Sequence, residues 1–228
     1  MTVCLRHRSV IDNLNSGAAL AIVGALLLTG AASAETVNGH LLEALRRGGH
    51  VIYFRHAPTE WSQQDRVRNL DDCTSCDPLR MRQLSAEGRA MAQQLGAAIR
   101  QLKIPIGQVL ASEYCRTRET AHLLGLGEVE TTRDVINARV ADYIGGRAAL
   151  ARTARARLTA TPPAGTNTVI VAHGNVFLLA AGTRPSEAGA AIVRGDGRGG
   201  FSVVAMVGPE EWASLIAIDN RSAEPAGL

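Results

Sequence analysis

An apolar segment that ends in two polar side chains is the strongest constraint in this sequence. Residues 51–54 read Val-Ile-Tyr-Phe and are followed directly by Arg55 and His56. Four apolar β-formers in a row are typical of a central strand of a parallel sheet whose two faces are both covered. An arginine beside an imidazole does not belong inside such a core, so we expect both at the carboxyl end of the strand, where open α/β sheets place their sites. Pro58 prevents the strand from continuing.

Two later segments repeat this arrangement. Residues 109–112 lead toward Arg116, and residues 168–172 lead directly into His173. Each segment is typical of a strand that stops at a cation or an imidazole and is followed by a helix. The ends of parallel strands meet at one edge of a sheet, so we expect these side chains to lie together with Arg55 and His56.

Helices are expected between the strands, because apolar residues recur there on a helical period. Serine at the start of such a segment or glycine at its end is typical of a helix terminus. The expected helices cover residues 37–47, 85–102 and 147–158, and the segments that begin near residues 116 and 174. Residues 190–193 and 201–207 flank a glycine-rich turn and predict a closing hairpin.

The three motifs, in this order, resemble those of the histidine phosphatase superfamily, whose fold is phosphoglycerate mutase-like. They are the Arg55-His56 pair, residues 112–121 with the pattern Ser-x-x-x-Arg-x-x-x-Thr-Ala, and the His173-Gly174 pair. The family more often has glycine after the first histidine, where this chain has Ala57. The resemblance extends from about residue 49 to about residue 212. It implies an α/β fold, a three-layer sandwich with a central, mostly parallel sheet flanked by helices.

The charges of these residues suit the cleavage of a phosphate ester. A phosphomonoester is a dianion, so its attacker needs nearby positive charge and must stay uncharged until it reacts. Arg55 and Arg116 are expected to grip the phosphate oxygens and to lower the pKa of His56, which then attacks as a neutral imidazole. His173 is expected to donate a hydrogen bond to a phosphate oxygen. Because side chains supply the positive field, we expect neither a metal nor another cofactor.

Two further residues are assigned to substrate binding. Thr59 closely follows the first motif, and Asn175 lies at the start of the helix after His173, where free N–H groups favour a bound anion. Arg118 lies on another side of its helix from Arg116 and is expected to be a surface charge.

The proton donor for the leaving group is the least determined residue of the expected site. Many relatives place it between the second arginine and the second histidine, where Glu119, Asp134 and Asp142 are candidates. Glu187 lies in a turn immediately before an expected strand that could return to the site. We expect Glu187 to be the donor, with Asp142 or Asp134 as the alternatives.

Three cysteines remain after an expected signal segment, and two of them lie in a polar loop. Cys73 and Cys76 belong to residues 61–82, which show no regular period and are expected to form a flap over the site. No second cysteine pair or spaced histidine pair accompanies them, so a disulfide is favoured over a metal site. We expect a bond between Cys73 and Cys115, slightly ahead of the local Cys73–Cys76 pair.

The first 34 residues have the features of a secretory signal. Arg6 and Arg8 precede an apolar stretch at residues 17–28, and Ala-Ser-Ala at residues 32–34 forms a cleavage site. The expected organisation is therefore a signal peptide over 1–34 and a histidine phosphatase domain over 35–228, in the periplasm or secreted. A retained membrane anchor is the alternative, although roughly twenty apolar residues are wanted to cross a bilayer. No stable membrane span is expected after cleavage.

The composition narrows the possible partners. Of 228 residues, 46% are hydrophobic and 20% charged, which is ordinary for one globular domain. The net charge is +3 and no run of basic residues occurs, so nucleic-acid binding is not indicated. The expected partner is a small phosphorylated substrate, and the sequence does not indicate an oligomeric state.

The sequence therefore predicts a periplasmic phosphatase that hydrolyses phosphomonoesters through a phosphohistidine intermediate. The main alternative is a catalytically silent phosphate-binding or envelope-interaction protein on the same fold. A thiol or metal protein built on Cys73-x-x-Cys76 is a third interpretation.

Overall fold

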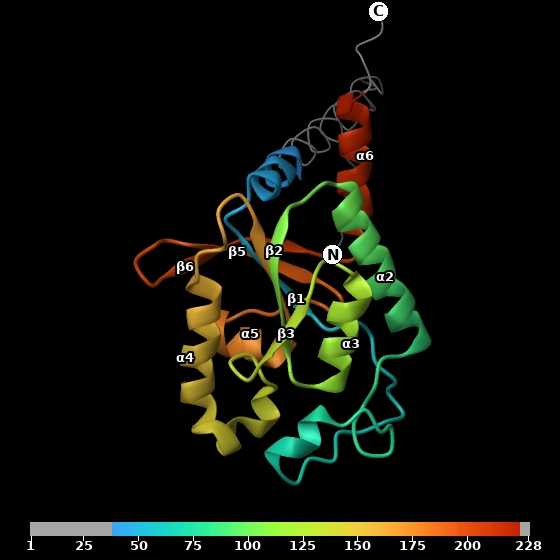
Figure 1. Cartoon of the computed structure of the whole chain (residues 1–228), viewed down its shortest axis with the longest axis vertical. Helices are drawn as coiled ribbons and strands as arrows, with labels where there is room; N and C mark the ends of the chain where they lie inside the picture. The colour runs from blue at the N-terminus through green and yellow to red at the C-terminus, as the bar shows by residue number, and fades with distance from the viewer. Residues whose placement is uncertain (1–37, 224–228) are drawn as a thin grey trace, which may run out of the picture. The chain divides into compact units, whose positions relative to one another are not determined.

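Six strands form one sheet in the order β3-β2-β4-β1-β5-β6 (Figure 1). The computed structural model describes residues 38–223, so the expected signal peptide and the boundary at residue 35 lie outside the described residues. Strands β1 to β4 pair in parallel, whereas β5 and β6 run antiparallel to their neighbours. The strands are β1 (Val51–Arg55), β2 (Ile106–Ser112), β3 (Val129–Thr132), β4 (Asn167–Ala172), β5 (Ala190–Gly195) and β6 (Phe201–Val207).

The central position of β1 follows from its sequence. Ile52 and Phe54 pack into one of two hydrophobic clusters, while Val51 and Tyr53 pack into the other. Successive side chains of a strand point to opposite faces, so a strand without polar residues must be covered on both sides. β1 is therefore bounded by apolar layers, and its first partly exposed residue is Arg55.

Helices cover both faces of the sheet, which confirms the expected three-layer α/β sandwich. The first cluster packs residues of a helix at 38–47, α2 (Ala86–Gln101), α3 (Cys115–Leu124) and α6 (Glu211–Ala223). The second cluster packs residues of η2 (Ala138–Ile144), α4 (Gly146–Thr159) and α5 (Gly174–Ala181). Figure 1 shows α2 and α3 on one side of the sheet and α4 and α5 on the other.

Helix α2 begins as its sequence predicts. The Ser85 side chain accepts a hydrogen bond from the N–H of Gly88, which satisfies one of the free donors of the first turn. Gly96 permits close packing of α2 on α3, since a side-chain carbon there would lie 1.8 Å from the carbonyl oxygen of Leu124. Helix α3 thus keeps a fixed position, and its first residues reach the edge of the sheet where β1 and β4 end.

Four elements were not expected from the sequence: the short edge strand β3, the terminal helix α6, and the 3₁₀ helices η1 (Leu70–Thr74) and η2. Strand β2 also begins at Ile106, inside a segment that reads as a loop because of its proline and glycine. β3 has no buried residue, so its four residues lack the apolar signal of an internal strand. Within residues 38–223, no helix combines the length and apolarity that a membrane span requires.

Candidate active site

The three strand ends bring the predicted residues together. β4 lies between β1 and β2 in the sheet, so His173 follows a strand that neighbours both other motifs. The rings of His56 and His173 meet edge to face with 5.5 Å between their centres. Both line a cavity of about 190 Å³. The lining residues are Arg55, His56, Asp65, Arg82, Arg116, Asn137, Arg139, His173, Gly174, Asn175 and Arg184.

His56 is held as a neutral imidazole with one free nitrogen. Its Nδ1 lies 2.9 Å from the carbonyl oxygen of Ala57. A carbonyl oxygen only accepts hydrogen bonds, so Nδ1 carries the proton and Nε2 keeps its lone pair. Burial, and then the charge of Arg116, lower the pKa of His56 well below its ordinary value. The side chain therefore presents an unprotonated nitrogen beside cationic groups.

His173 is oriented by Ser112, which the sequence places at the end of β2. The Ser112 Oγ lies 3.0 Å from Nε2 of His173. The Nδ1 atom is buried and has no hydrogen-bond partner among the described residues. Burial and the charge of Arg116 lower the pKa of this imidazole as well. When the Ser112 hydroxyl donates to Nε2, the neutral ring carries its proton on Nδ1, which is then a donor available to an anion.

Arg116 is bound at one edge by Asp65, a residue that was not singled out in the sequence. Its Nη1 donates to Asp65 Oδ1 at 2.9 Å and its Nη2 donates to Asp65 Oδ2 at 3.1 Å. The two side chains are only 2% and 7% exposed. Its Nε–H is buried without a partner among the described residues, and the guanidinium lies over the ring of Tyr114. Asp65 therefore fixes Arg116 while leaving the Nε edge able to bind an anion.

Arg55 is paired with Glu187, one of the expected proton donors. The Arg55 Nη2 donates to Glu187 Oε1 at 2.8 Å, and both side chains are largely buried. Glu187 lies in the turn before β5, as the sequence indicated, and contacts the site through Arg55.

The other three carboxyl candidates lie away from the cavity. Glu119 forms an ion pair with Arg89, and Asp134 forms one with Arg157. Asp142 is exposed, and none of the three is among the residues that line the cavity with His56. Asp65, in contrast, lines this cavity directly. Asp65 and Glu187 are therefore the carboxyl groups that the structure brings to the site.

The two residues assigned to substrate binding have different positions. Thr59 is 2% exposed, forms an isolated bridge with Leu84 and is not among the lining residues. Asn175 does line the cavity. Its Nδ2 donates to Asn137 Oδ1 at 2.9 Å and its Oδ1 accepts from the N–H of Ala138. The Asn175 side chain thus joins the start of α5 to the start of η2.

The disulfide connects Cys76 with Cys115, so the expected Cys73–Cys115 bond is wrong. Cys73 lies in η1 and its thiol is buried in a hydrophobic cluster, which raises its pKa. Cys76 lies just after η1, where the chain is exposed. The bond joins the polar loop to the first residue of α3, directly before Arg116. The position of the link beside the site is as expected, but it uses the other cysteine of the loop.

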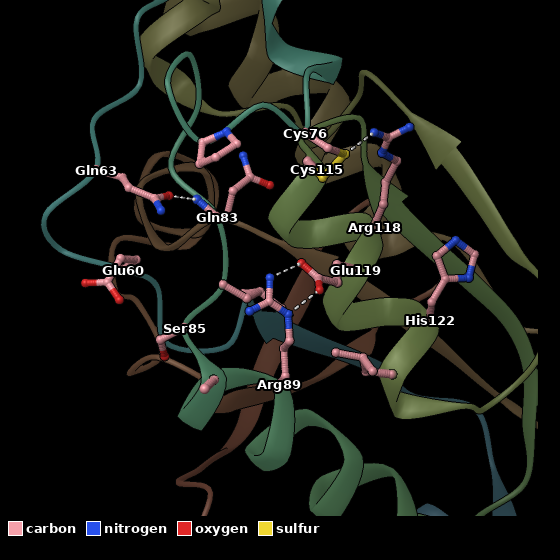
Figure 2. A pocket seen from close by; sticks show the side chains of 14 residues that line it. Glu60, Gln63, Cys76, Gln83, Ser85, Arg89, Cys115, Arg118, Glu119 and His122 are labelled. Atoms are coloured by element: carbon pink, nitrogen blue, oxygen red, sulfur yellow. Dashed lines mark hydrogen bonds and ion pairs between the residues drawn. A yellow bond between two sulfur atoms is a disulfide. The ribbon is translucent and has the colours of Figure 1, made fainter.

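A second cavity of about 760 Å³ lies beside this disulfide (Figure 2). Arg89 and Glu119 pair within it, and Arg118 donates to the carbonyl of Thr74 and lies 3.4 Å from the Cys76 sulfur. Arg118 is half-buried against the loop, so it is not the freely solvated charge that was expected. Of the described residues, none lines both cavities. Residues 38–223 also contain no group of three or more His, Cys, Asp or Glu side chains arranged to hold a metal ion.

The comparison with known families agrees with the geometry. Residues 51–145 match the family model of the histidine phosphatase superfamily (branch 1). This segment is similar to the histidine phosphatase superfamily and makes up less than half of the 228 residues. The matched segment contains Arg55, His56 and Arg116, while His173 lies beyond it and is brought to the same cavity by β4. A search of curated protein sequences gives no significant match.

Solved structures share the histidine phosphatase fold at low sequence identity. A putative alpha-ribazole-5'-P phosphatase from Escherichia coli K-12 is 15% identical, with 71% of this chain and 98% of that chain covered and a TM-score of 0.50. A putative phosphohistidine phosphatase SixA from Agrobacterium tumefaciens is 16% identical, with 71% and 98% covered and a TM-score of 0.48. A phosphoserine phosphatase from Entamoeba histolytica is 14% identical, with 69% and 96% covered and a TM-score of 0.48.

Reduction of the disulfide is expected to lower the free energy of unfolding by about 2–4 kcal/mol, because the bond closes a long loop. Urea unfolding with and without dithiothreitol measures this difference. The Cys73→Ser variant should keep the response to reductant, and Cys76→Ser should lose it. The opposite pattern would show that Cys73 forms the bond.

Acidification is expected to destabilise the protein through its two buried imidazoles. The pKa of His56 and that of His173 are lowered by folding, so the unfolded chain takes up protons first as the pH falls through about 6.5. The stability that the neutral imidazoles contribute is therefore intact above about pH 6.5. It is lost as the pH falls toward their lowered pKa in the folded protein. Urea unfolding at about pH 8 and about pH 5 measures it. His173→Gln should reduce the difference, and an unchanged difference would contradict the assignment.

Proposed function

We propose that this chain is an exported phosphatase that hydrolyses phosphomonoesters through a phosphohistidine formed on His56. The observation that carries the proposal is the free Nε2 of a neutral, buried imidazole in a cavity lined by five arginines. Such a nitrogen can attack an anionic phosphorus only where positive charge is already fixed around it. The match of residues 51–145 to the histidine phosphatase superfamily supports the same chemistry.

The first step transfers the phosphoryl group to the protein. The Nε edge of Arg116 and the guanidinium of Arg55 hold the phosphate oxygens, while His173 donates from Nδ1. The Nε2 lone pair of His56 attacks phosphorus, a nitrogen–phosphorus bond forms and the bond to the ester oxygen breaks. The alcohol leaves with a proton supplied by a nearby carboxyl group.

The second step returns the imidazole to its starting form. Water attacks the phosphohistidine, the nitrogen–phosphorus bond breaks and inorganic phosphate leaves. The carboxylate that donated a proton in the first step can take one from this water, so the two steps together consume one water molecule and leave the protein unchanged.

Export is proposed on the sequence of residues 1–34, with its charged, apolar and small-residue segments in that order. Protein recovered from the periplasm should begin at Glu35 by mass measurement. A full-length protein in the membrane fraction would contradict this part of the proposal and support the anchor.

His56→Ala is expected to lower turnover of p-nitrophenyl phosphate by more than about 10³-fold, because the nucleophile is removed. It should also abolish labelling of the acid-quenched protein by a radioactive phosphoryl donor. His122→Ala is a matched control, since this exposed histidine lies outside the cavity. A labelled His56→Ala protein would place the nucleophile elsewhere. Phosphate binding by a wild-type protein that hydrolyses no ester would instead favour the catalytically silent alternative.

The proton donor is expected to be Glu187, with Asp65 as the second candidate brought to the site by the structure. An alkyl alcohol needs a proton to leave, whereas p-nitrophenolate does not, and a general acid typically contributes about 10²–10⁴ in rate. Glu187→Gln should therefore slow alkyl phosphate hydrolysis far more than p-nitrophenyl phosphate hydrolysis. If Asp65→Asn shows this selective loss and Glu187→Gln does not, the assignment moves to Asp65.

A further inference from the structure

The arginines that line the catalytic cavity do not all have acidic partners. Arg116 is paired with Asp65, and Arg55 is paired with Glu187. Arg82 lies over the ring of Trp61, with 4.6 Å between its guanidinium carbon and the ring centre. The remaining two, Arg139 and Arg184, are exposed and form no ion pair with any carboxylate of residues 38–223.

The backbone of Arg139 is held near the segment that follows His173. The Asn137 Oδ1 accepts hydrogen bonds from the N–H of Arg139 at 3.0 Å and from Nδ2 of Asn175 at 2.9 Å. Asn137 is 7% exposed, and Asn175 is half-buried. The start of η2, which carries Arg139, is therefore hydrogen-bonded to Asn175, two positions after His173.

Arg184 approaches the same segment from the turn that precedes β5. A side-chain carbon built on Gly174 would lie 3.8 Å from the Cβ of Arg184 and 3.1 Å from the Cδ of Arg55. Gly174 is thus close to both Arg55, which is expected to bind the phosphate, and Arg184, which belongs to the exposed pair. Arg139 and Arg184 come from two different elements and converge on the residues that follow His173.

The cavity has more positive charge than one phosphate group balances. Five guanidiniums and two carboxylates, Asp65 and Glu187, give a net charge of plus three when both imidazoles are neutral. A phosphate dianion brings the total to plus one. Three of the five guanidiniums, those of Arg82, Arg139 and Arg184, have no carboxylate partner among the described residues. Arg82 contacts the Trp61 ring, whereas Arg139 and Arg184 are exposed.

We propose that Arg139 and Arg184 form a second anion subsite, which selects phosphomonoesters that carry another acidic group on the alcohol part. The inference rests on the proposed phosphatase function and names the class of its substrate. The volume of about 190 Å³ leaves room for the phosphoryl group and the first atoms of the alcohol. An acidic group on these first atoms then reaches the guanidiniums of Arg139 and Arg184, which line the same cavity and can bind it in pairs.

The first test measures binding without turnover, in the His56→Ala protein. Phosphonoacetate and ethylphosphonate are matched probes, because both carry a phosphonate and only the first carries a carboxylate. Calorimetry at low salt should give at least about ten-fold tighter binding of phosphonoacetate, which corresponds to one good charged contact. Adding Arg139→Gln and Arg184→Gln should bring the two affinities to within about two-fold.

Arg147→Gln with Arg152→Gln is the control, since both arginines are exposed on α4 and lie outside the cavity. This control should keep the preference for phosphonoacetate. Circular dichroism of each variant shows that it is folded, and the single variants Arg139→Gln and Arg184→Gln serve if the double variant is not. If the His56→Ala protein with Arg139 and Arg184 intact binds both probes equally, the inference is overturned.

The second test separates this inference from the proposed function. With His56 restored, the double variant should lose about ten-fold in kcat/KM on an alkyl phosphate that carries a carboxylate. Its kcat/KM on p-nitrophenyl phosphate, which carries no second acidic group, should fall by a clearly smaller factor. Normal hydrolysis with no preference for the acidic substrate overturns the subsite and leaves the phosphatase intact. The opposite result is a protein that hydrolyses no ester but binds phosphonoacetate more tightly than ethylphosphonate, with this preference lost in the double variant. That result overturns the phosphatase and supports the subsite.

Discussion

The ion pair between Arg116 and Asp65 is the interaction on which the cavity depends. A guanidinium that is 2% exposed has lost almost all of its water, and a carboxylate that binds it at two points restores part of that solvation. Removing one partner of such a pair typically costs about 3–5 kcal/mol, because the other charge stays buried. Asp65 also accepts the N–H of Arg82, so the same carboxylate fixes the loop that closes the site. The position of the Arg116 charge and the position of the loop are therefore set together.

The carboxylates at the site also change what the substrate encounters. If Arg55 and Arg116 had no partners, their mutual repulsion would add to the burial penalty of the free protein. Glu187 and Asp65 remove most of that repulsion, and each leaves N–H groups of its arginine unused. An arriving phosphate then joins an existing network of charges. Its binding energy is lower than two unpaired arginines would give. Its orientation, however, is fixed by groups that do not have to move.

Much of the fold and half of the site could be predicted because their signals are local. The apolar run before Arg55 and His56 predicts both a buried strand and the position of these two residues at its carboxyl end. The same reasoning predicts the position of His173 after β4. Asp65 could not be found in this way, since its loop has no period and its partner is distant in sequence. The cysteine pairing failed for a related reason. Only the turn of η1 decides that Cys73 faces the core and Cys76 faces α3, and a sequence does not show that turn.

The disulfide limits how the polar loop can move. Cys76 is covalently attached to the residue before Arg116, so residues 61–82 cannot swing away as one lid. A displacement of the residues before Cys76 would take Asp65 away from Arg116, whereas Cys76 would stay joined to the helix that carries Arg116. The covalent bond therefore keeps the loop beside the cavity even when the ion pair between Asp65 and Arg116 is broken.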